Sequence, residues 1–484
     1  MRGGKRTQMA MARNPPTALL IYPPTGLYRR DHRCQNRVCD QTVQVVMPPI
    51  DLAYMASFLR EAGLESTIID YPAQGRGLED FKNDIGKPIR FLVLKTTSST
   101  FLKDMEICRL ARSLREDLKI ILFEAPAPNG RSQADVSGVF DGLVHGESEL
   151  PDMIASLSPP GEVACVEADL HEDSNTYSTP GSHRRDFLDY PFPARDLLQI
   201  ELYRLPVSNE PMTVIHAARG CPHKCIFCPA PSLYGGVVRQ RPVDSVMEEI
   251  GHCVDRFGAR FILFDAETFT LDRIWVMALC DQIFAQGQRF SWGANSRVDT
   301  VDSEMLIRMK QAGCRILGFG VESGDESMLS KMKKSIHIPQ IKRAFRECSE
   351  AGILTHAFFV MGLPWENQAT LARTLSLAKE LKPDLFDFNI VLPLPGSEYE
   401  VIAKKENLIV RTLDGAGYSD SPVRSFHLSH DELVKARRRM LLRLYLSPEY
   451  LLRTVRREAI SFGRFYRLIV YGLRRLAALA GAQG

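Results

Sequence analysis

The sequence lacks a hydrophobic run long enough to cross a membrane. A spanning helix needs about 18 uninterrupted apolar residues, and no run approaches that length. The short apolar stretch Ala18–Tyr22 is followed at once by Pro23 and Pro24, so no signal peptide is predicted. We therefore expect a cytoplasmic protein, with membrane contact confined to the periphery.

The chain also lacks a large excess of charge of either sign. Sixty-one Lys and Arg residues oppose 58 Asp and Glu residues, which leaves a formal net charge of +3. That balance carries no global signature of a nucleic-acid-binding protein, so no nucleic acid partner is expected. The 11 cysteines are odd in number and scattered over 484 residues. They indicate reduced thiols and a metal site, because a secreted disulfide framework would be denser and shorter.

The length predicts two or three domains, and the pattern of apolar segments divides the chain. Short apolar runs alternate with amphipathic helical stretches from Ala18 to Val144, which predicts a doubly wound, Rossmann-like α/β domain with a parallel sheet. The predicted divisions are a disordered basic tail (1–16), this α/β domain (17–157), a linker (158–209), a second α/β unit (210–400) and a helical basic region (401–484).

The second unit repeats the alternation six times. Six βα units in series predict an open, partial (β/α)6 barrel with its chemistry at the carboxyl ends of the strands. The predicted strands are Met212–Ala218, Arg260–Phe264, Phe290–Ala294, Arg315–Val321, Thr355–Val360 and Phe386–Leu392.

The strongest chemical signal is a Cx3CxxC triplet, Cys221, Cys225 and Cys228, just after the first of these strands. Three thiolates can hold three irons of a four-iron, four-sulfur cluster and leave the fourth iron open to another ligand. A zinc ion would need a fourth protein ligand, for which His223 inside the loop is the candidate. Free thiols without a common role are the remaining alternative.

This triplet, with Phe227 beside its last cysteine and six βα units after it, resembles the radical S-adenosylmethionine (SAM) enzymes over about residues 210–400. The resemblance implies that the three cysteines ligate a [4Fe-4S] cluster whose open iron binds SAM. It further implies reductive cleavage of SAM to a 5′-deoxyadenosyl radical. An electron donor such as flavodoxin or ferredoxin would supply the electron.

Polar or glycine-containing segments follow each later strand, as in the same family. By resemblance they hold the cosubstrate, and an arginine suits its carboxylate while a carboxylate suits its ammonium or ribose hydroxyls. Helix capping and tight turns are the alternative explanations. The candidate cosubstrate-binding residues are Asp265, Arg297, Glu322, Gly362 and Pro393. No catalytic residue is predicted.

The front domain is similar to the cobalamin-binding domain that precedes the barrel in one subclass of radical SAM enzymes. The similarity lies in the segments Pro48–Ala56, Leu59–Leu64, Gly146–Glu149 and Pro191–Asp196. Two features depart from it: no Asp-x-His-x-x-Gly supplies an axial histidine, and Glu124–Pro128 replaces the usual glycines. The domain therefore binds cobalamin without histidine, or it has lost cobalamin. Cys34 and Cys39 lie near the expected ligand edge, as an idle reduced pair or as redox groups.

The C-terminal region is strongly basic. Twelve Lys or Arg residues and two acidic residues lie between Lys435 and Arg475, a local charge of +10. On a helix, one apolar face would be formed by Phe462, Phe465, Ile469, Leu473, Leu476 and Ala480. This helix either docks on the barrel or contacts an anionic membrane surface.

Together these features predict a cobalamin-dependent radical SAM methyltransferase that acts on an unactivated carbon of a small-molecule or lipid substrate. The nearest alternative is oxidative cyclisation or carbon rearrangement without methyl transfer. A tRNA methylthiotransferase would need a further cysteine triplet and a terminal β-barrel, and a cofactor sensor would need an output module. The sequence has no signal for either addition.

Overall fold

The structure is a computed structural model that describes residues 17–31, 35–123, 138–159, 185–287 and 289–458, with residues 466, 467, 470 and 472. Several predictions lie outside the described residues: the basic tail 1–16, Cys34, Glu124–Pro128, and the apolar face of the last predicted helix. No helix in the described part of the chain is long and apolar enough to cross a membrane.

The front domain is built on a five-stranded parallel sheet with the order β4-β1-β5-β6-β7. Its strands are β1 (Thr17–Tyr22), β4 (Glu65–Asp70), β5 (Phe91–Lys95), β6 (Lys119–Phe123) and β7 (Gly142–Val144). Helices α1 (Ile50–Glu61) and α4 (Leu150–Leu157) share a core with one face, and α2 (Leu78–Ile85) and α3 (Phe101–Leu114) share a core with the other. This confirms the predicted α/β class with a sheet covered on both faces.

The strand order places a switch point between β1 and β5. From β1 the chain moves to β4 on one side and then returns to β5 on the other. In such sheets, ligands bind at the carboxyl ends of the strands beside the switch point. Tyr22 and Lys95 are the last residues of β1 and β5, and a small hairpin of β2 (Tyr28–Arg30) and β3 (Gln35–Arg37) follows β1.

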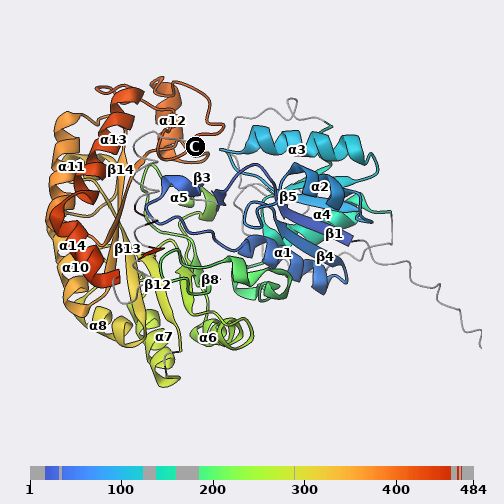
Figure 1. The fold of residues 1–484 in the computed structure, drawn as a ribbon, viewed down its shortest axis with the longest axis horizontal. Coiled ribbons are helices and arrows are strands. Elements are labelled where there is room, and N and C mark those ends of the chain that lie inside the picture. The colour runs from blue at the N-terminus through green and yellow to red at the C-terminus, as the bar shows by residue number, and fades with distance from the viewer. Residues whose placement is uncertain are drawn as a thin grey trace, which may run out of the picture.

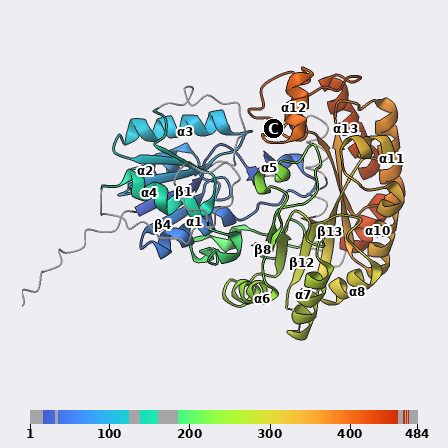
Figure 2. The same ribbon diagram turned by 180° about the vertical axis from the view of Figure 1, so that it is seen from behind.

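The second sheet has six parallel strands in the order β15-β14-β13-β12-β11-β8. The described edge strands β8 and β15 do not pair with each other, so the sheet is open. Figures 1 and 2 show its helices following one another around the outer side of the sheet. The strands are β8 (Met212–His216), β11 (Phe261–Asp265), β12 (Ser291–Ser296), β13 (Cys314–Glu322), β14 (Leu354–Met361) and β15 (Leu385–Ile390).

Helices occupy the connections between these strands and the end of the chain. They are α5 (Ala230–Tyr234), α6 (Val243–Gly251), α7 (Arg273–Ala285), α8 (Ser303–Gln311), α9 (Glu326–Lys331), α10 (Ile338–Ala351), α11 (Gln368–Leu381), α12 (Glu398–Lys405), α13 (His430–Tyr445) and α14 (Pro448–Glu458). A short antiparallel pair, β9 (Ala218–Arg219) and β10 (Arg239–Gln240), flanks α5.

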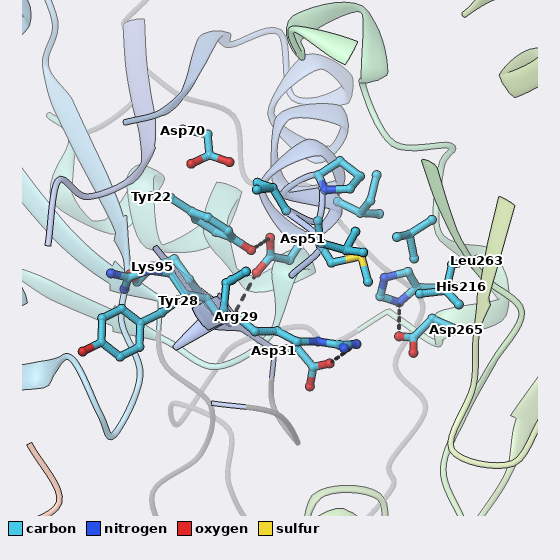
Figure 3. Close-up of a pocket in the computed structure, with 18 of the residues that line it drawn as sticks. Tyr22, Tyr28, Arg29, Asp31, Asp51, Asp70, Lys95, His216, Leu263 and Asp265 are labelled. Atoms are coloured by element: carbon cyan, nitrogen blue, oxygen red, sulfur yellow. Dashed lines mark hydrogen bonds and ion pairs between the residues drawn. The ribbon is translucent and has the colours of Figure 1, made fainter. Parts of the chain in front are cut away.

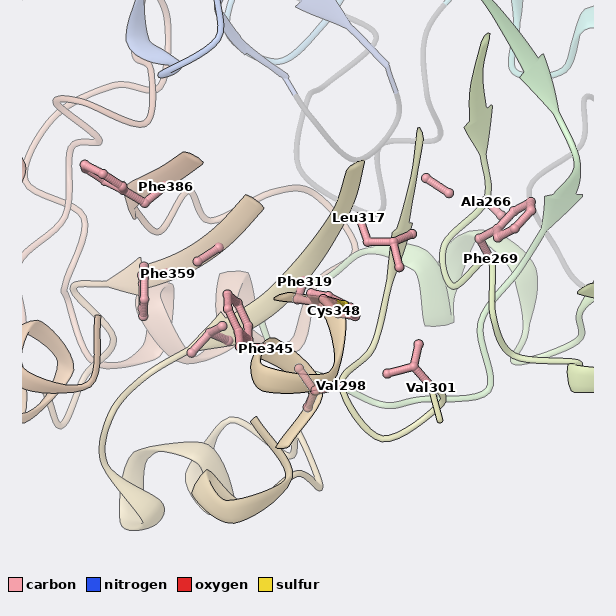
Figure 4. Packing of buried hydrophobic residues seen from close by; sticks show 14 of the residues in the cluster. Ala266, Phe269, Val298, Val301, Leu317, Phe319, Phe345, Cys348, Phe359 and Phe386 are labelled. Atoms are coloured by element: carbon pink, nitrogen blue, oxygen red, sulfur yellow. The ribbon is translucent and has the colours of Figure 1, made fainter. Parts of the chain in front are cut away.

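The main core lies between the second sheet and its helices. Alternate strand residues such as Phe319 and Phe359 face outward and meet helix residues such as Phe345 and Cys348 of α10 (Figure 4). The thiols of Cys253, Cys280, Cys314 and Cys348 are all buried in this core, as expected for structural cysteines.

A connecting segment of the front domain, residues 41–49, crosses the gap between the two edges of the second sheet. At β15, the Thr42 amide donates to Asp387 Oδ1 at 2.6 Å. Toward β8, Val45 packs in a cluster with Met212 and Val214. The open sheet is therefore bridged by residues that precede it by more than 160 positions in the chain.

The linker fastens the two units from the other side. Arg195 is buried and donates to the Val214 carbonyl at 2.7 Å and to Glu249 at 2.5 Å. Three short 3-10 turns, Phe187–Asp189, Arg195–Leu197 and Ile200–Leu202, lie in the described part of this connection.

Candidate functional site

The cysteine loop begins at Gly220, where only glycine fits. Its φ is +103°, and a Cβ atom there would lie 1.8 Å from the Val237 carbonyl oxygen. The Gly220 amide donates to Glu267 Oε2 at 2.8 Å, which ties the loop to the segment after β11. Further along, the Ile226 amide donates to the Met332 carbonyl and the Ile226 carbonyl accepts from Tyr399. The loop is thus held at both its start and its middle.

The three predicted cluster ligands are cysteines of this loop. Cys225 is buried, and Cys221 and Cys228 are partly exposed. Burial raises the pKa of the Cys225 thiol, and the nearby Lys334 ammonium opposes that shift. Lys334 would therefore stabilise a thiolate at this position, which is the form that ligates iron. Three soft thiols in one loop fit an iron–sulfur cluster by the chemistry of the donor set.

His223, the candidate zinc ligand, lies within the same loop. Its Nε2 atom is buried without a hydrogen-bond partner, and burial together with Arg297 lowers the pKa of the imidazole. Among the described residues, no three His, Cys, Asp or Glu side chains converge on a position for one metal ion. This holds for the three loop cysteines as well as for His223, so the cluster ligands stay a prediction from the donor set.

Glu322, at the end of β13, forms a buried ion pair that the sequence did not reveal. Its carboxylate accepts from Lys334 Nζ at 2.7 Å. Glu322 has a left-handed φ of +63°, beside an irregularity in the β13–β14 register. Gly320 makes room for the pair, because a Cβ there would lie 2.5 Å from Lys334 Nζ. The only signal for Lys334 was a pair of lysines after α9.

Arg297, after β12, is held rigidly beside the same group. It donates two 2.9 Å hydrogen bonds to Asp299 and a third to the Lys334 carbonyl at 2.8 Å. Burial alone would raise the pKa of Asp299, but the hydrogen bonds from Arg297 hold it below its usual value. Arg297 and Glu322 both influence the Cys225 thiol electrostatically, so the structure brings two of the five predicted cosubstrate residues to the cysteine loop.

The other three predicted cosubstrate residues lie elsewhere. Asp265, at the end of β11, faces His216 with 3.9 Å between its Oδ2 and the imidazole Nδ1. Gly362 packs close to Ile390 and Leu433 with φ of +84°, and Pro393 is buried beside a small apolar cluster that includes Ala416. No described contact joins Gly362 or Pro393 to the cysteine loop, and their predicted role remains a prediction.

A cavity lies between the carboxyl ends of the two sheets (Figure 3). Its interior volume is about 100 Å³, and it opens to solvent. The front domain contributes Tyr22, Tyr28, Asp51, Asp70, Lys95 and Glu147 to its lining, and the second unit contributes Val214, His216, Arg219, Leu263, Asp265 and Glu267. The front-domain side of the cavity is the β1/β5 switch point.

Lys95 is the unusual group on the front-domain side. It is fully buried, its ammonium lies 3.5 Å from the centre of the Phe123 ring, and Asp51 Oδ2 is 3.5 Å away. Asp51 instead accepts a 2.9 Å hydrogen bond from Tyr22. Burial lowers the pKa of Lys95, although Asp51 opposes that shift. Lys95 Nζ therefore has no hydrogen-bond partner among the described residues and lines a cavity.

Glu147 and Arg219 connect the two sides of the cavity. Glu147 follows β7 and accepts from Arg219 at 2.6 and 3.1 Å. Arg219 immediately precedes Gly220, and its guanidinium lies 4.6 Å from the Phe187 ring centre and 5.2 Å from that of Tyr190. Because both partners are largely buried, this charge pair joins the front domain directly to the start of the cysteine loop.

The fold and the loop define the class of protein, and the comparison with protein families agrees. Residues 215–378 match the Radical SAM superfamily model. The second unit of the chain therefore carries a radical SAM domain.

The relatives extend beyond that domain. An uncharacterised methyltransferase of Pyrococcus horikoshii is 26% identical over 448 residues, which cover 90% of this chain and 94% of that protein. An anaerobic magnesium-protoporphyrin IX monomethyl ester cyclase of Rubrivivax gelatinosus is 24% identical over 72% of this chain and 65% of its own length.

One solved structure resembles both units together. It is the cobalamin-dependent S-adenosylmethionine radical enzyme OxsB with aqua-cobalamin and S-adenosylmethionine bound. It covers 96% of this chain and 72% of its own, with a TM-score of 0.66 and 16% identity. This likeness shows that the folds of the front domain and of the radical SAM domain occur together in that protein too.

Proposed function

We propose that the protein is a cobalamin-dependent radical SAM methyltransferase that transfers a methyl group to an unactivated carbon. The observation that carries this proposal is the cavity between the β1/β5 switch point and the mouth of the second sheet. It borders the start of the cysteine loop at Arg219. A ligand bound at the switch point would face the cosubstrate across one enclosed space. The similarity to a named methyltransferase over nearly the full length of both chains supports the same conclusion.

The division of labour follows the predicted domains. Residues 17–157 would hold cobalamin and residues 210–400, as a partial (β/α)6 barrel, would hold the cluster and SAM. When bound, the cluster supplies an electron to SAM and cobalamin supplies the methyl carrier. Cys221, Cys225 and Cys228 would ligate the cluster. The cosubstrate-binding residues would be Asp265, Arg297, Glu322, Gly362 and Pro393.

The chain's own contribution is positioning and exclusion of water. Arg297, held by Asp299, and Glu322, held by Lys334, have fixed positions beside the cysteine loop, and such preorganised groups would hold a cosubstrate without reorganisation. The Glu147–Arg219 pair sets the distance between the two ligand sites. Residues 41–49 cover the gap in the sheet, which keeps water from reaching a radical from that side.

Cobalamin would bind without a histidine from the front domain. The described cavity wall contributed by residues 17–159 contains no histidine, and Lys95, whose ammonium makes no hydrogen bond to a described residue, is part of it. A reduced flavodoxin or ferredoxin would deliver the electron, and the substrate would be a small molecule or a lipid.

Oxidative cyclisation is the second candidate, favoured by the cyclase relative. That match leaves about a third of the cyclase's length uncovered, whereas the methyltransferase match covers 94% of its partner. Methyl transfer therefore fits the whole chain better.

The test is an anaerobic reaction of the reconstituted protein with SAM that carries an isotopically labelled methyl group, together with lipid and small-molecule extracts. We expect a product that gains one labelled methyl group, formed together with 5′-deoxyadenosine. Cys221→Ala is the control and should yield neither. Formation of 5′-deoxyadenosine with a product that loses hydrogen and gains no label would favour cyclisation and contradict methyl transfer.

A further inference from the structure

Helix α14 exposes an apolar side to solvent, whereas helices of globular proteins usually bury their apolar side. Its inner contacts are made by Tyr450, which packs on Phe386 at 5.3 Å between ring centres, and by Arg453, which donates to the Lys382 carbonyl. Leu451, Leu452 and Val455 are 48%, 58% and 40% exposed. These three side chains recur at helical spacing and form one outward apolar strip.

The outer side of the neighbouring helix α13 carries cations. A shallow groove there is lined by Lys435, Arg438, Arg439, Leu442, Arg443 and Leu446. Leu446 is 54% exposed and lies two residues before α14 begins. We call Lys435, Arg439, Arg443, Leu446, Leu451, Leu452 and Val455 the α13–α14 surface. It combines four large apolar side chains with three cations.

Among the described residues, exposed large hydrophobic side chains are concentrated on the α13–α14 surface. Elsewhere in the described residues, exposed large hydrophobics such as Leu102 and Ile274 are mostly isolated in sequence. Contiguous exposed apolar groups mark contact surfaces, because their burial releases about 25 cal/mol for each Å² removed from water. The nearby acid Glu449 is already paired with Lys382 at 2.6 Å.

We propose that the α13–α14 surface binds an anionic lipid bilayer. Leucine and valine side chains would enter the interface between head groups and acyl chains, and the flanking cations would contact lipid phosphates. Charge complementarity selects this occupant over a second copy of the chain, since two copies of the same basic surface repel each other. Arg467, which follows α14 in the chain, donates to the Val207 carbonyl before β8 at 2.7 Å. The proposal does not depend on the radical chemistry.

The experiment is co-sedimentation of the full-length protein with vesicles of phosphatidylcholine alone or mixed with phosphatidylglycerol, at low and high salt. We expect binding to the anionic vesicles at low salt and a large loss at high salt. Arg439→Gln with Arg443→Gln should weaken binding about 30-fold, since each cation near an anionic surface adds about 1 kcal/mol. Leu451→Ser with Leu452→Ser should also reduce binding at either salt concentration.

A matched control replaces an exposed leucine and an exposed cation on the front domain, Leu102→Ser with Lys103→Gln, and should bind as the wild type does. All variants concern exposed side chains, and unchanged thermal unfolding would verify their folding. The proposal is wrong if the wild type ignores anionic vesicles, or if both double variants bind as tightly as the control. It is also wrong if sedimentation velocity shows a dimer that the leucine variant dissociates, because a second copy would then cover this surface.

Discussion

The surroundings of the cysteine loop and the front-domain side of the cavity treat charge differently. On the side of the second sheet, Arg297 is paired with Asp299 and Glu322 with Lys334 at 2.7 to 2.9 Å. On the front-domain side, Lys95 is buried 3.5 Å from Asp51 and makes no hydrogen bond to a described residue. The charges beside the cysteine loop are therefore paired without a ligand, whereas the Lys95 ammonium makes no hydrogen bond to a described residue. A ligand should stabilise the front-domain side more than the cysteine side.

The largest expected effect concerns the cysteine loop. Cys221→Ala should abolish both the visible absorption of a reconstituted iron–sulfur cluster and the formation of 5′-deoxyadenosine from SAM, because only two thiolates would remain. Iron content, the absorption spectrum and chromatography of the nucleoside measure this. Cys280→Ala, in the barrel core, should retain the cluster. Full cluster content in a variant that lacks all three loop cysteines would overturn the assignment.

The next effect tests the paired side. Glu322→Gln leaves the Lys334 ammonium buried beside a neutral amide, so we expect a loss of about 3 kcal/mol in the free energy of unfolding. Chemical denaturation measures this loss. The double variant Glu322→Gln with Lys334→Met removes the uncompensated charge and should recover part of it. Equal stability of the single variant and the wild type would show that the pair is exposed in solution.

The two sides should also respond oppositely to pH. Burial raises the pKa of Asp70 to about 6, above its usual 3.8, and Tyr203 donates to the carboxylate at 3.1 Å. The folded state thus binds a proton more tightly than the unfolded state. The stability that protonated Asp70 contributes to the folded state is present below pH 4. It is lost as the pH rises to about 6, by up to about 3 kcal/mol. Asp299, with its lowered pKa, contributes stability above its unfolded pKa and loses it as the pH falls.

Unfolding at pH 2 to 7 of Asp70→Asn and Asp299→Asn checks this prediction. The first variant should lose less stability than the wild type as the pH rises, and the second should lose less as the pH falls. The same pH dependence in both variants would contradict the opposite signs.

A smaller effect is expected at Lys95. Lys95→Met replaces a buried ammonium by an apolar side chain of similar length, and such replacements change stability by about 1 kcal/mol or raise it. Binding of hydroxocobalamin, measured by its change in absorption, should nevertheless weaken. Lys103→Met on the exposed side of α3 should bind as the wild type does. A large loss of stability with unchanged binding would mean that Asp51 neutralises Lys95 fully.

The smallest expected effect is a spectrum that does not change. Electron paramagnetic resonance of the protein-bound cob(II)alamin form should lack nitrogen superhyperfine splitting from a lower ligand. His216→Ala, which alters the one histidine in the described cavity lining, should leave that spectrum as it is. Splitting in the wild type that disappears in this variant would place a histidine beneath the metal.

Sequence patterns predicted the strands well, because a buried parallel strand needs a continuous apolar run whatever its neighbours are. Predicted Arg260–Phe264 and observed β11 (Phe261–Asp265), for example, differ by one residue at each end. Spacing in one loop was enough to find the cysteines. Lys334, Lys95 and the Glu147–Arg219 pair could not be found in that way, because their partners are 12 to 72 residues away or on another domain. Their roles depend on burial, and a sequence does not show which of its charged residues are buried.

The bridge formed by residues 41–49 has a consequence for folding during synthesis. Thr42 and Asp387 are 345 residues apart, and at about 5 to 20 residues per second the second appears roughly 20 to 70 s after the first. Until then Val43, Val45, Val46 and Met47 have no second sheet to pack against. The nascent front domain therefore exposes this apolar segment for much of translation, and a chaperone that binds the segment should raise the yield of the folded protein.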